Sequence, residues 1–257
     1  MTIRVGVSGA GGRMGATVCR AVAVDAELEL VAAVDPSTVG ATVEGLEIAG
    51  EPRAFADAGA EVVVDFTVAE AARRTVPWLA MHGIHAVVGT TGLTEADLDA
   101  FGEEFGEGGP NCIVASNFSI SAVLMMQLAE RAAPYFETAE IIELHHDEKV
   151  DAPSGTALTT AERMAAASDE WAADPTRTEV VPGARGGLGP GGIRLHAVRM
   201  RGMVAHQEVI LGALGQTLTI RQDSYDRASY MPGVILAVKH VAEHDGLTIG
   251  LDRYLNR

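Results

Sequence analysis

The stretch IRVGVSGAGGRMG, residues 3–15, decides how this chain begins to fold. Its first six residues are rich in β-branched side chains, which is typical of a buried strand. Glycines follow at Gly9, Gly11, Gly12 and Gly15, and an Ala- and Val-rich run to Ala23 predicts a helix. A strand, a glycine turn and a helix in this order are what a dinucleotide-binding βαβ unit requires.

The glycines at Gly9, Gly12 and Gly15 have GxxGxxG spacing, and Gly11 also supplies the second glycine of the commoner GxGxxG. Glycine clusters also form ordinary turns, so the context matters. Residues 28–34 predict a second strand that ends in Asp35, about 20 residues past the glycines, where an acid meets the adenosine ribose hydroxyls. We therefore expect a dinucleotide site rather than a turn followed by a solvated aspartate.

Further strand and helix alternations follow this first unit. Residues 62–67 and 86–92 read as strands, each followed by a helix, the second of which Thr94 caps. The alternation predicts a parallel sheet with crossover helices. Two polar stretches, residues 89–92 and 111–118, fall where strands end, which is where open α/β sheets bind ligands. The alternative for each stretch is an ordinary loop.

A third and longer polar stretch, ELHHDEKVDAPSGT at residues 143–156, follows a β-branched run that predicts a strand. His145 and His146 therefore lie at the end of that strand. Ala152-Pro153-Ser154 signals a helix start. The first backbone N–H groups of a helix have no partner within it, so those of Gly155 and Thr156 offer a seat for an anion.

Charge supports an acidic ligand at this stretch. The chain carries a formal net charge of −16 and has only two lysines, Lys149 and Lys239. Lys149 lies three residues after the histidine pair. A compact ammonium kept where arginine is otherwise preferred indicates a titratable or carboxylate-binding group. A solvated histidine pair is the plain alternative. We expect no metal, because the chain has no HExxH pattern and Cys19 and Cys112 stand alone.

Bulk properties bound the function. At 257 residues with 47% hydrophobic content, the chain has ample material for one large or two small packed domains. A sequence pI near 4.8 argues against binding to nucleic acid or to anionic membranes. No apolar run approaches the ~18 residues of a membrane span, and no apolar leader follows Met1. We therefore expect a cytoplasmic protein.

From Asn117 onward the pattern changes. A helix from Ile120 to about Ala133 precedes the histidine strand, and residues 182–192 are too glycine-rich for regular structure. Three strands then follow without helices between them, at residues 193–199, 204–211 and 216–222, and they pair most simply as an antiparallel meander. His196 and His206, on these strands, read as structural. An open sheet needs a cover for its other face, which a homo-oligomer interface supplies.

The fold class that we predict is α/β: a Rossmann-like dinucleotide-binding domain with a second α+β substrate and oligomerisation domain built on an open mixed sheet. A helix from Tyr225 to about Val241 and a strand at Thr248-Ile249 return the chain to the first domain. The predicted division is residues 1–117 plus 226–257 for the dinucleotide-binding domain, and 118–225 for the substrate domain.

Residues 143–157 closely resemble the substrate loop of the dihydrodipicolinate reductase family, the 4-hydroxy-tetrahydrodipicolinate reductases. The resemblance extends over the whole chain. Residues 9–15 look like the family's cofactor loop, residues 89–91 and 115–118 like its nicotinamide-side loops, and residues 201–208 like its substrate-domain hairpin.

The resemblance implies an NADH- or NADPH-dependent reductase of the diaminopimelate and lysine pathway that acts on a cyclic dicarboxylate. It implies a homotetramer built through the second domain's sheets, and a cofactor domain that closes onto the substrate domain. His145 is then the general acid/base, Lys149 a proton donor or carboxylate partner, and His146 a substrate contact, while Gly155 and Thr156 hold a carboxylate. The cofactor contacts that it implies are Gly9, Ala10, Gly11, Gly12, Arg13, Met14, Asp35, Gly89, Thr90, Thr91, Ala115, Ser116, Asn117 and Phe118.

Two positions depart from relatives that carry basic groups near the adenosine phosphate. Pro36 follows Asp35, and Val68 follows Phe66-Thr67, so NADH is mildly favoured, although Arg13 can still reach a phosphate. Two rival functions remain: another two-domain NAD(P)-dependent oxidoreductase, and a non-enzymatic NAD(H)-binding redox sensor. A semialdehyde dehydrogenase needs a nucleophilic cysteine, for which Cys112 in an apolar strand is poorly suited. A sensor needs no proton donor.

Overall fold

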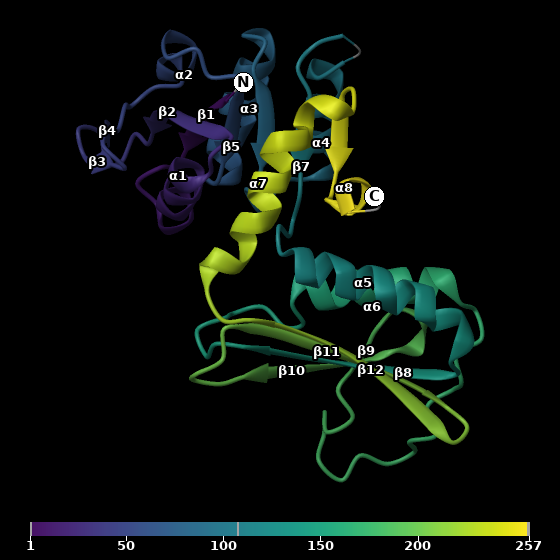
Figure 1. Ribbon diagram of the computed structural model, residues 1–257. Helices are drawn as coiled ribbons and strands as arrows, with labels where there is room; N and C mark the ends of the chain where they lie inside the picture. Colours follow the sequence, from purple (N-terminus) through teal and green to yellow (C-terminus); the bar gives the residue numbers. More distant parts are fainter. Residues whose placement is uncertain (1, 107, 256–257) are drawn as a thin grey trace. The chain divides into compact units, whose positions relative to one another are not determined.

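The computed structural model describes residues 2–106 and 108–255 (Figure 1). The chain divides into two compact units. The first runs up to Ile120 and resumes at Tyr230, and the second is Ser121–Ser229. Cofactor binding by the first unit and substrate binding by the second stays a prediction at this point.

The first unit is built on a six-stranded parallel sheet in the order β13-β7-β6-β5-β1-β2. The strand order reverses at β1, which has β2 on one side and β5 on the other. The strands are β1 Ile3–Ser8, β2 Leu28–Val34, β5 Val62–Asp65, β6 His85–Val88, β7 Cys112–Val114 and β13 Leu247–Ile249. The α/β fold expected from the glycine turn and the βα rhythm is therefore confirmed.

Helices connect these strands. They are α1 Arg13–Val24, α2 Arg53–Asp57, α3 Ala69–Met81, α4 Glu95–Glu104, α7 Met231–His240 and α8 Asp252–Leu255, with a short 3-10 turn at Val241–Glu243. Thr94 caps α4 as expected: its side chain accepts from the Asp97 N–H while the Asp97 carboxylate accepts from the Thr94 N–H. The sequence reading missed α2 and the hairpin of β3 Thr42–Val43 and β4 Leu46–Glu47.

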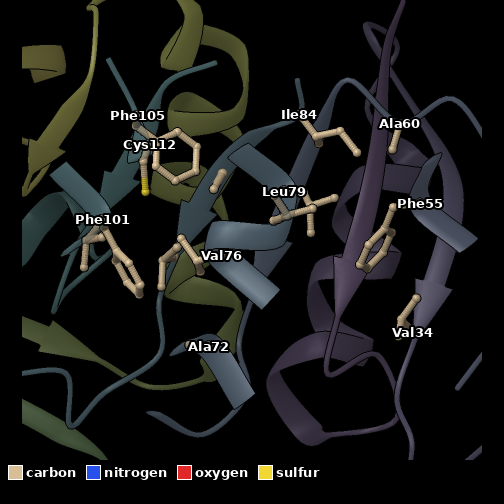
Figure 2. Close-up of a cluster of buried hydrophobic side chains, with 14 of the residues drawn as sticks. Val34, Phe55, Ala60, Ala72, Val76, Leu79, Ile84, Phe101, Phe105 and Cys112 are labelled. Atoms are coloured by element: carbon tan, nitrogen blue, oxygen red, sulfur yellow. The ribbon is translucent and has the colours of Figure 1, made fainter. Parts of the chain in front are cut away.

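One buried cluster packs the sheet against its helices (Figure 2). All four residues of β5 are buried, as a central strand covered on both faces requires. Side chains from α3, including Val76 and Leu79, contact this strand layer together with Phe55 of α2 and Phe101 of α4. The packing holds the carboxyl ends of β1, β5 and β6 at a common edge, where the polar loops follow.

The second unit is a five-stranded mixed sheet in the order β12-β11-β8-β10-β9. Its strands are β8 Thr138–His145, β9 Gly187–Leu188, β10 Arg194–Arg199, β11 Ala205–Ala213 and β12 Gln216–Ser224. Its helices are α5 Ile120–Ala132 and α6 Gly155–Ala167, with 3-10 turns at Ala133–Tyr135, Pro190–Gly192 and Arg227–Tyr230. Both long helices lie on the same side of the sheet in Figure 1.

The expected antiparallel meander is wrong at its first strand. β8 lies between β10 and β11, pairing parallel with β10 and antiparallel with β11, and only β11 and β12 form a hairpin. Period-two patterning says which face of a strand is buried but not which strand is its neighbour. Ala139, Ile141 and Glu143 on one face of β8 are buried, and the central position gives its backbone partners on both edges.

Two further expectations need correction. Residues 182–192 are not wholly irregular, because Gly187–Leu188 adds an edge strand that pairs antiparallel with β10. No helix begins at Tyr225, because β12 continues to Ser224 and α7 starts only at Met231. Pro232 explains this start, since proline lacks an N–H and is tolerated in the first turn of a helix but not inside it.

In the part of the chain that the structure describes, no helix is both long and apolar enough to cross a membrane.

His85 makes folding sensitive to pH. It begins β6, and its Nδ1 accepts a hydrogen bond from the Asn111 N–H at 2.8 Å, which requires an unprotonated nitrogen. Burial lowers the pKa of His85, because the charged ring is poorly solvated inside the protein. The unfolded chain then binds the proton more readily. The stability from this group is present above pH ~6.5 and is lost as the pH falls through the lower folded-state pKa.

We expect the free energy of unfolding, measured by urea titration at fixed protein concentration, to fall between pH ~6.5 and ~5, above the range where ordinary carboxylates titrate. His85→Asn keeps an acceptor near the Nδ1 position without titrating there, and should remove most of this fall. His146→Asn, at an exposed position, is the matched control and should leave it unchanged. An undiminished fall in His85→Asn would contradict the assignment.

Candidate active site

The glycine turn after β1 brings the start of α1 close to the sheet edge. Gly9 has φ +79°, and a Cβ added to Gly15 would lie 2.0 Å from the Gly9 carbonyl oxygen, so both positions need glycine. α1 begins at Arg13, and its N-cap, Gly12, provides no side-chain cap. Uncapped N–H groups at the start of a 12-residue helix are suited to a pyrophosphate.

Asp35 lies against this turn. Its carboxylate accepts hydrogen bonds from the Gly11 N–H at 3.1 Å and from the Ser37 N–H at 2.9 Å. A Cβ at Gly11 would lie 2.0 Å from the Thr38 hydroxyl oxygen, so the turn and the loop after β2 pack without space for a side chain. The acid and the glycine turn are therefore together, as recognition of a dinucleotide requires.

The loops after β5 and β6 are joined by the buried Asp65. Its Oδ1 accepts from the Thr67 hydroxyl at 2.7 Å and from the Thr90 hydroxyl at 2.6 Å, and the Thr67 N–H donates to the Thr90 oxygen. The hydroxyl of Thr90 is thus engaged inside the protein. These loops lie at the carboxyl ends of β5 and β6, next to the point where the strand order reverses.

The other residues predicted at this edge differ in exposure. A Cβ at Gly89 would strike the ring of Phe66, whose centroid lies 5.7 Å from that of the buried Phe118. The Asn117 side chain accepts from the Ser119 N–H. Ala10 and Ala115 are buried and Met14 is partly buried, whereas Arg13, Thr91 and Ser116 are exposed. The structure thus brings all these segments to the strand ends of the first unit.

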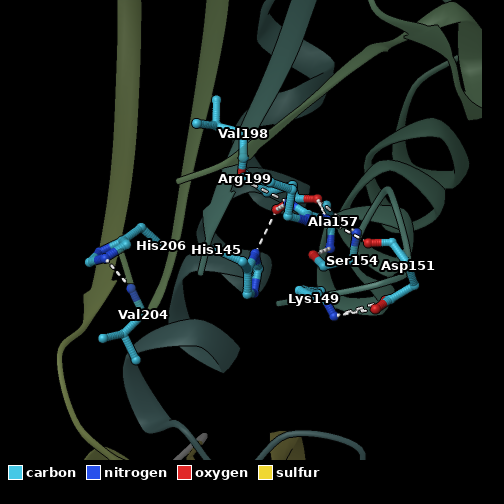
Figure 3. A network of polar contacts seen from close by, with 10 residues as sticks. His145, Lys149, Asp151, Ser154, Ala157, Val198, Arg199, Val204 and His206 are labelled. Atoms are coloured by element: carbon cyan, nitrogen blue, oxygen red, sulfur yellow. Dashed lines mark hydrogen bonds and ion pairs between the residues drawn. The ribbon is translucent and has the colours of Figure 1, made fainter. Parts of the chain in front are cut away.

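In the second unit, β8 carries Glu143 and His145 on one face, because side chains two residues apart in a strand point the same way. The Glu143 side chain is buried, and that of His145 is mostly buried. His145 Nδ1 lies 2.6 Å from Glu143 Oε2 (Figure 3). A carboxylate only accepts, so Nδ1 carries the hydrogen and Nε2 is left for proton exchange.

Glu143 receives three more hydrogen bonds. Arg199 of β10 donates from Nη1 to Oε2 at 2.8 Å and from Nη2 to Oε1 at 2.7 Å, and the Ser154 N–H donates to Oε1 at 3.0 Å. Burial raises the pKa of Glu143, but the hydrogen bonds from His145 and Arg199 outweigh it and lower that pKa to about 2. Glu143 is therefore a carboxylate throughout the neutral range.

Lys149 and His146 lie in the loop after β8. Lys149 Nζ lies 2.8 Å from both carboxylate oxygens of Asp151, and this bond lowers the pKa of Asp151. Asp151 is exposed, and its carbonyl oxygen accepts from Arg199 Nη2 at 2.6 Å. The His146 side chain is exposed. The ammonium is thus held by an exposed carboxylate beside the Glu143 cluster, which consists of Glu143, His145, Arg199 and Ser154.

α6 begins next to this cluster. Ser154 is its N-cap and accepts from the Ala157 N–H, after a cis peptide bond between Ala152 and Pro153. A Cβ at Gly155 would meet nothing within 4 Å, so the first helical residue faces open space. Two hydrogen bonds connect the first turns of α6 to β11: Gln207 donates to the Thr160 hydroxyl, and Thr160 donates to the Thr156 carbonyl.

The sequence reading missed three members of this cluster: Glu143, Arg199 and Asp151. Glu143 had a usable signal, because it is an acid on the buried face of an apolar strand, where an unpaired charge is costly. Arg199 had none, since it joins the cluster only through the pairing of β10 with β8, in which Arg199 is opposite His145.

The remaining reactive side chains have structural surroundings. His196 and His206 each lie 2.7 Å from a carboxylate oxygen, of Glu140 and Asp223 respectively. Cys112 is buried and burial raises its thiol pKa, which disfavours the nucleophile that a semialdehyde dehydrogenase needs. Among the described residues, no group of three or more metal-ligating side chains occurs.

Comparison with known proteins gives consistent matches over the whole chain. The family model "Dihydrodipicolinate reductase, N-terminus" matches residues 3–118, and "Dihydrodipicolinate reductase, C-terminus" matches residues 121–255. The 4-hydroxy-tetrahydrodipicolinate reductase of Beutenbergia cavernae is 49% identical, and that of Corynebacterium diphtheriae 48% identical, each with complete coverage of both chains. A dipicolinate-bound dihydrodipicolinate reductase from Paenisporosarcina sp. TG-14 superimposes with a TM-score of 0.90 at 35% identity, covering 99% of this chain and 100% of that one.

Proposed function

The chain belongs to the dihydrodipicolinate reductase family, and from that premise we propose that its two polar clusters are the cofactor and substrate sites of one reductase. It is an oxidoreductase that reduces 4-hydroxy-tetrahydrodipicolinate in lysine and diaminopimelate biosynthesis. The proposals below concern the residues that perform this reaction, the cofactor that they prefer and the assembly of the chain.

One observation carries the assignment of the substrate site. A histidine with a fixed Nδ1 partner, an ammonium and an uncrowded helix start occur together in a chain of net charge −16. The nicotinamide, when bound, supplies the hydride. Reduction of a conjugated ring then leaves negative charge that needs a proton at the neighbouring carbon. His145 is the side chain suited to deliver that proton near neutral pH, through Nε2.

Lys149, His146 and the start of α6 hold the two carboxylates in this proposal. The N–H groups at Gly155 and Thr156 suit one carboxylate, and the Lys149 ammonium suits the other. Lys149 already bonds Asp151, so a substrate carboxylate shares the ammonium or displaces that exposed side chain. The dipicolinate-bound relative supports a small dicarboxylate as the ligand. Lys149 stays an alternative proton donor.

The first unit fits a nicotinamide dinucleotide, because the glycine turn leaves no space for side chains where a pyrophosphate approaches. We infer a mild preference for NADH over NADPH. Asp35 is positioned by backbone N–H groups and offers its remaining lone pairs to ribose hydroxyls, whereas a 2′-phosphate would meet its negative charge. The exposed Arg13 at the start of α1 can still reach a phosphate.

We also propose a homotetramer that assembles through the sheet of the second unit. Along β8, Ala139 and Ile141 are buried, whereas Ile142 and Leu144 on the opposite face are only partly buried. Ile142 and Leu144 share this incompletely covered face with the ion-paired Glu140, and such a face is suited to a second copy. A native mass by light scattering tests this proposal. Cytoplasmic residence, the absence of nucleic-acid partners and the division of roles between the units stay predictions.

Turnover tests the proposed function directly. Pure protein should oxidise NADH, followed at 340 nm, when the condensation product of pyruvate and aspartate semialdehyde is added. His145→Gln should lower kcat by about 10²-fold or more, as the loss of a general acid does, and Lys149→Ala should do the same. Absence of turnover between pH ~6 and ~9, the range around a histidine's titration, would refute the enzyme assignment. Near-normal kcat in His145→Gln would remove His145 from its role.

Gly155→Ala tests the carboxylate seat separately from the fold. The added methyl group meets no protein atom within 4 Å, so the free energy of unfolding should not fall. The methyl group occupies the space proposed for a carboxylate, so the substrate KM should rise about tenfold or more, a loss of roughly 1.4 kcal/mol, while the cofactor KM stays unchanged. Gly102→Ala in α4 is a matched control, since its Cβ would make only an ordinary contact. An unchanged substrate KM in Gly155→Ala would contradict the seat.

Asp35→Ala tests the adenosine end. Removing a charged hydrogen-bond acceptor for the ribose should weaken NADH binding by about tenfold or more. NADPH should be weakened less, because its 2′-phosphate gains from the loss of a negative neighbour. The affinity for each cofactor is measured by fluorescence titration. Asp35→Asn keeps an acceptor oxygen for the backbone N–H groups, so it distinguishes the effect of the lost charge from the effect of a distorted loop. Equal weakening of both cofactors would mean that Asp35 does not touch the ribose.

A further inference from the structure

Glu143 does not reach the substrate in the proposed function, yet it is the most fully bonded side chain of the cluster. Oε2 accepts from His145 Nδ1 and from Arg199 Nη1, and Oε1 accepts from Arg199 Nη2 and from the Ser154 N–H. Burying a carboxylate costs several kcal/mol unless its lone pairs are used. All four positions of this one are used: one donor is His145 of the proposed active site, and another is the N–H of Ser154, the N-cap directly before Gly155.

We propose that Glu143 is a positioning residue that holds the hydrogen of neutral His145 on Nδ1, directs Nε2 at the substrate, and keeps the start of α6 in register with that nitrogen. The inference rests on the proposed role of His145. It extends that role, because it names the group that decides which nitrogen of the ring exchanges its proton.

Two hydrogen bonds support this proposal: the one from His145 Nδ1 to Oε2 of Glu143, and the one from the Ser154 N–H to Oε1. At 2.6 Å from a group that only accepts, Nδ1 must donate in both the neutral and the charged ring. A neutral histidine in water prefers its hydrogen on Nε2. In the proposed role Nε2 exchanges the proton, so the neutral ring must carry its hydrogen on Nδ1 instead, and the bond to Glu143 enforces this. On the other oxygen, the bond from the Ser154 N–H fixes the N-cap of α6, one residue before Gly155.

Arg199 makes this arrangement possible. Its guanidinium forms a bidentate pair with Glu143 and supplies the charge that a buried carboxylate needs. The same Nη2 also donates to the carbonyl oxygen of Asp151, whose side chain holds Lys149. One ion pair therefore connects the proton donor, the ammonium and the helix start. A purely structural alternative is that Glu143 only neutralises Arg199.

The hydrogen position on the ring distinguishes the two roles. With histidines labelled with 15N, two-bond proton–nitrogen NMR correlation spectra report which nitrogen of a neutral ring carries hydrogen, and His145→Gln assigns the signal. We expect Nδ1–H in the wild-type protein. In Glu143→Gln the side-chain amide can donate to Nδ1, so we expect a switch to Nε2–H and a fall in kcat of about 10²-fold or more, with a smaller change in the substrate KM.

Glu140→Gln is the matched control. Glu140 lies on the same strand and accepts from His196, so this variant removes a carboxylate partner from a different histidine and should leave kcat and the His145 signal unchanged. If Glu143→Gln fails to fold because Arg199 is left unpaired, Glu143→Gln combined with Arg199→Met removes both charges. That double variant should show the same switch in folded protein.

Two results would overturn the inference: an Nε2–H ring in wild-type protein, or a folded Glu143→Gln with kcat within about threefold of wild type. A purely structural role predicts lower stability with the hydrogen still on Nδ1. Failure of the proposed function is distinguishable, because absent turnover in wild-type protein leaves the hydrogen position measurable and unaffected.

Discussion

The buried ion pair between Glu143 and Arg199 is the interaction on which the proposed substrate site depends. Two strands that are far apart in sequence, β8 and β10, are paired so that Arg199 is opposite His145, and the carboxylate lies on the same face of β8. Because an unpaired buried charge is costly, the pair requires this strand order. The loop with Lys149 and the start of α6 are bonded to the same two side chains.

The electrostatics of the chain make this arrangement selective. A net charge of −16 disfavours anions in general, and the second unit concentrates a guanidinium, an ammonium and a helix start within one loop and its neighbouring strands. Glu143 and Asp151 neutralise part of that positive charge, so the site does not attract every anion equally. What remains unoccupied by protein is the space in front of Gly155. A small dicarboxylate is the ligand that such a seat suits.

The first unit solves a different problem, which is to bring a long cofactor close to a sheet edge. Small residues at Gly9, Gly11 and Gly15 allow backbone to approach backbone, and Asp65 joins the loops after β5 and β6. The two sites thus use opposite means. The proposed cofactor site has glycines in place of side chains, and the proposed substrate site has charged side chains whose hydrogen bonds are satisfied within the protein.

By itself, the sequence determined the βα order of the first unit, the cap at Thr94, the strand that ends at His145 and the helix start at Ser154, because local spacing and capping chemistry specify them. The likeness of residues 143–157 to one family identified the reaction. Only the tertiary structure decided that β8 lies between β10 and β11, and hence that Arg199 meets Glu143. Strand neighbours are chosen by long-range packing and charge pairing, and neither is recorded in the local pattern of either strand.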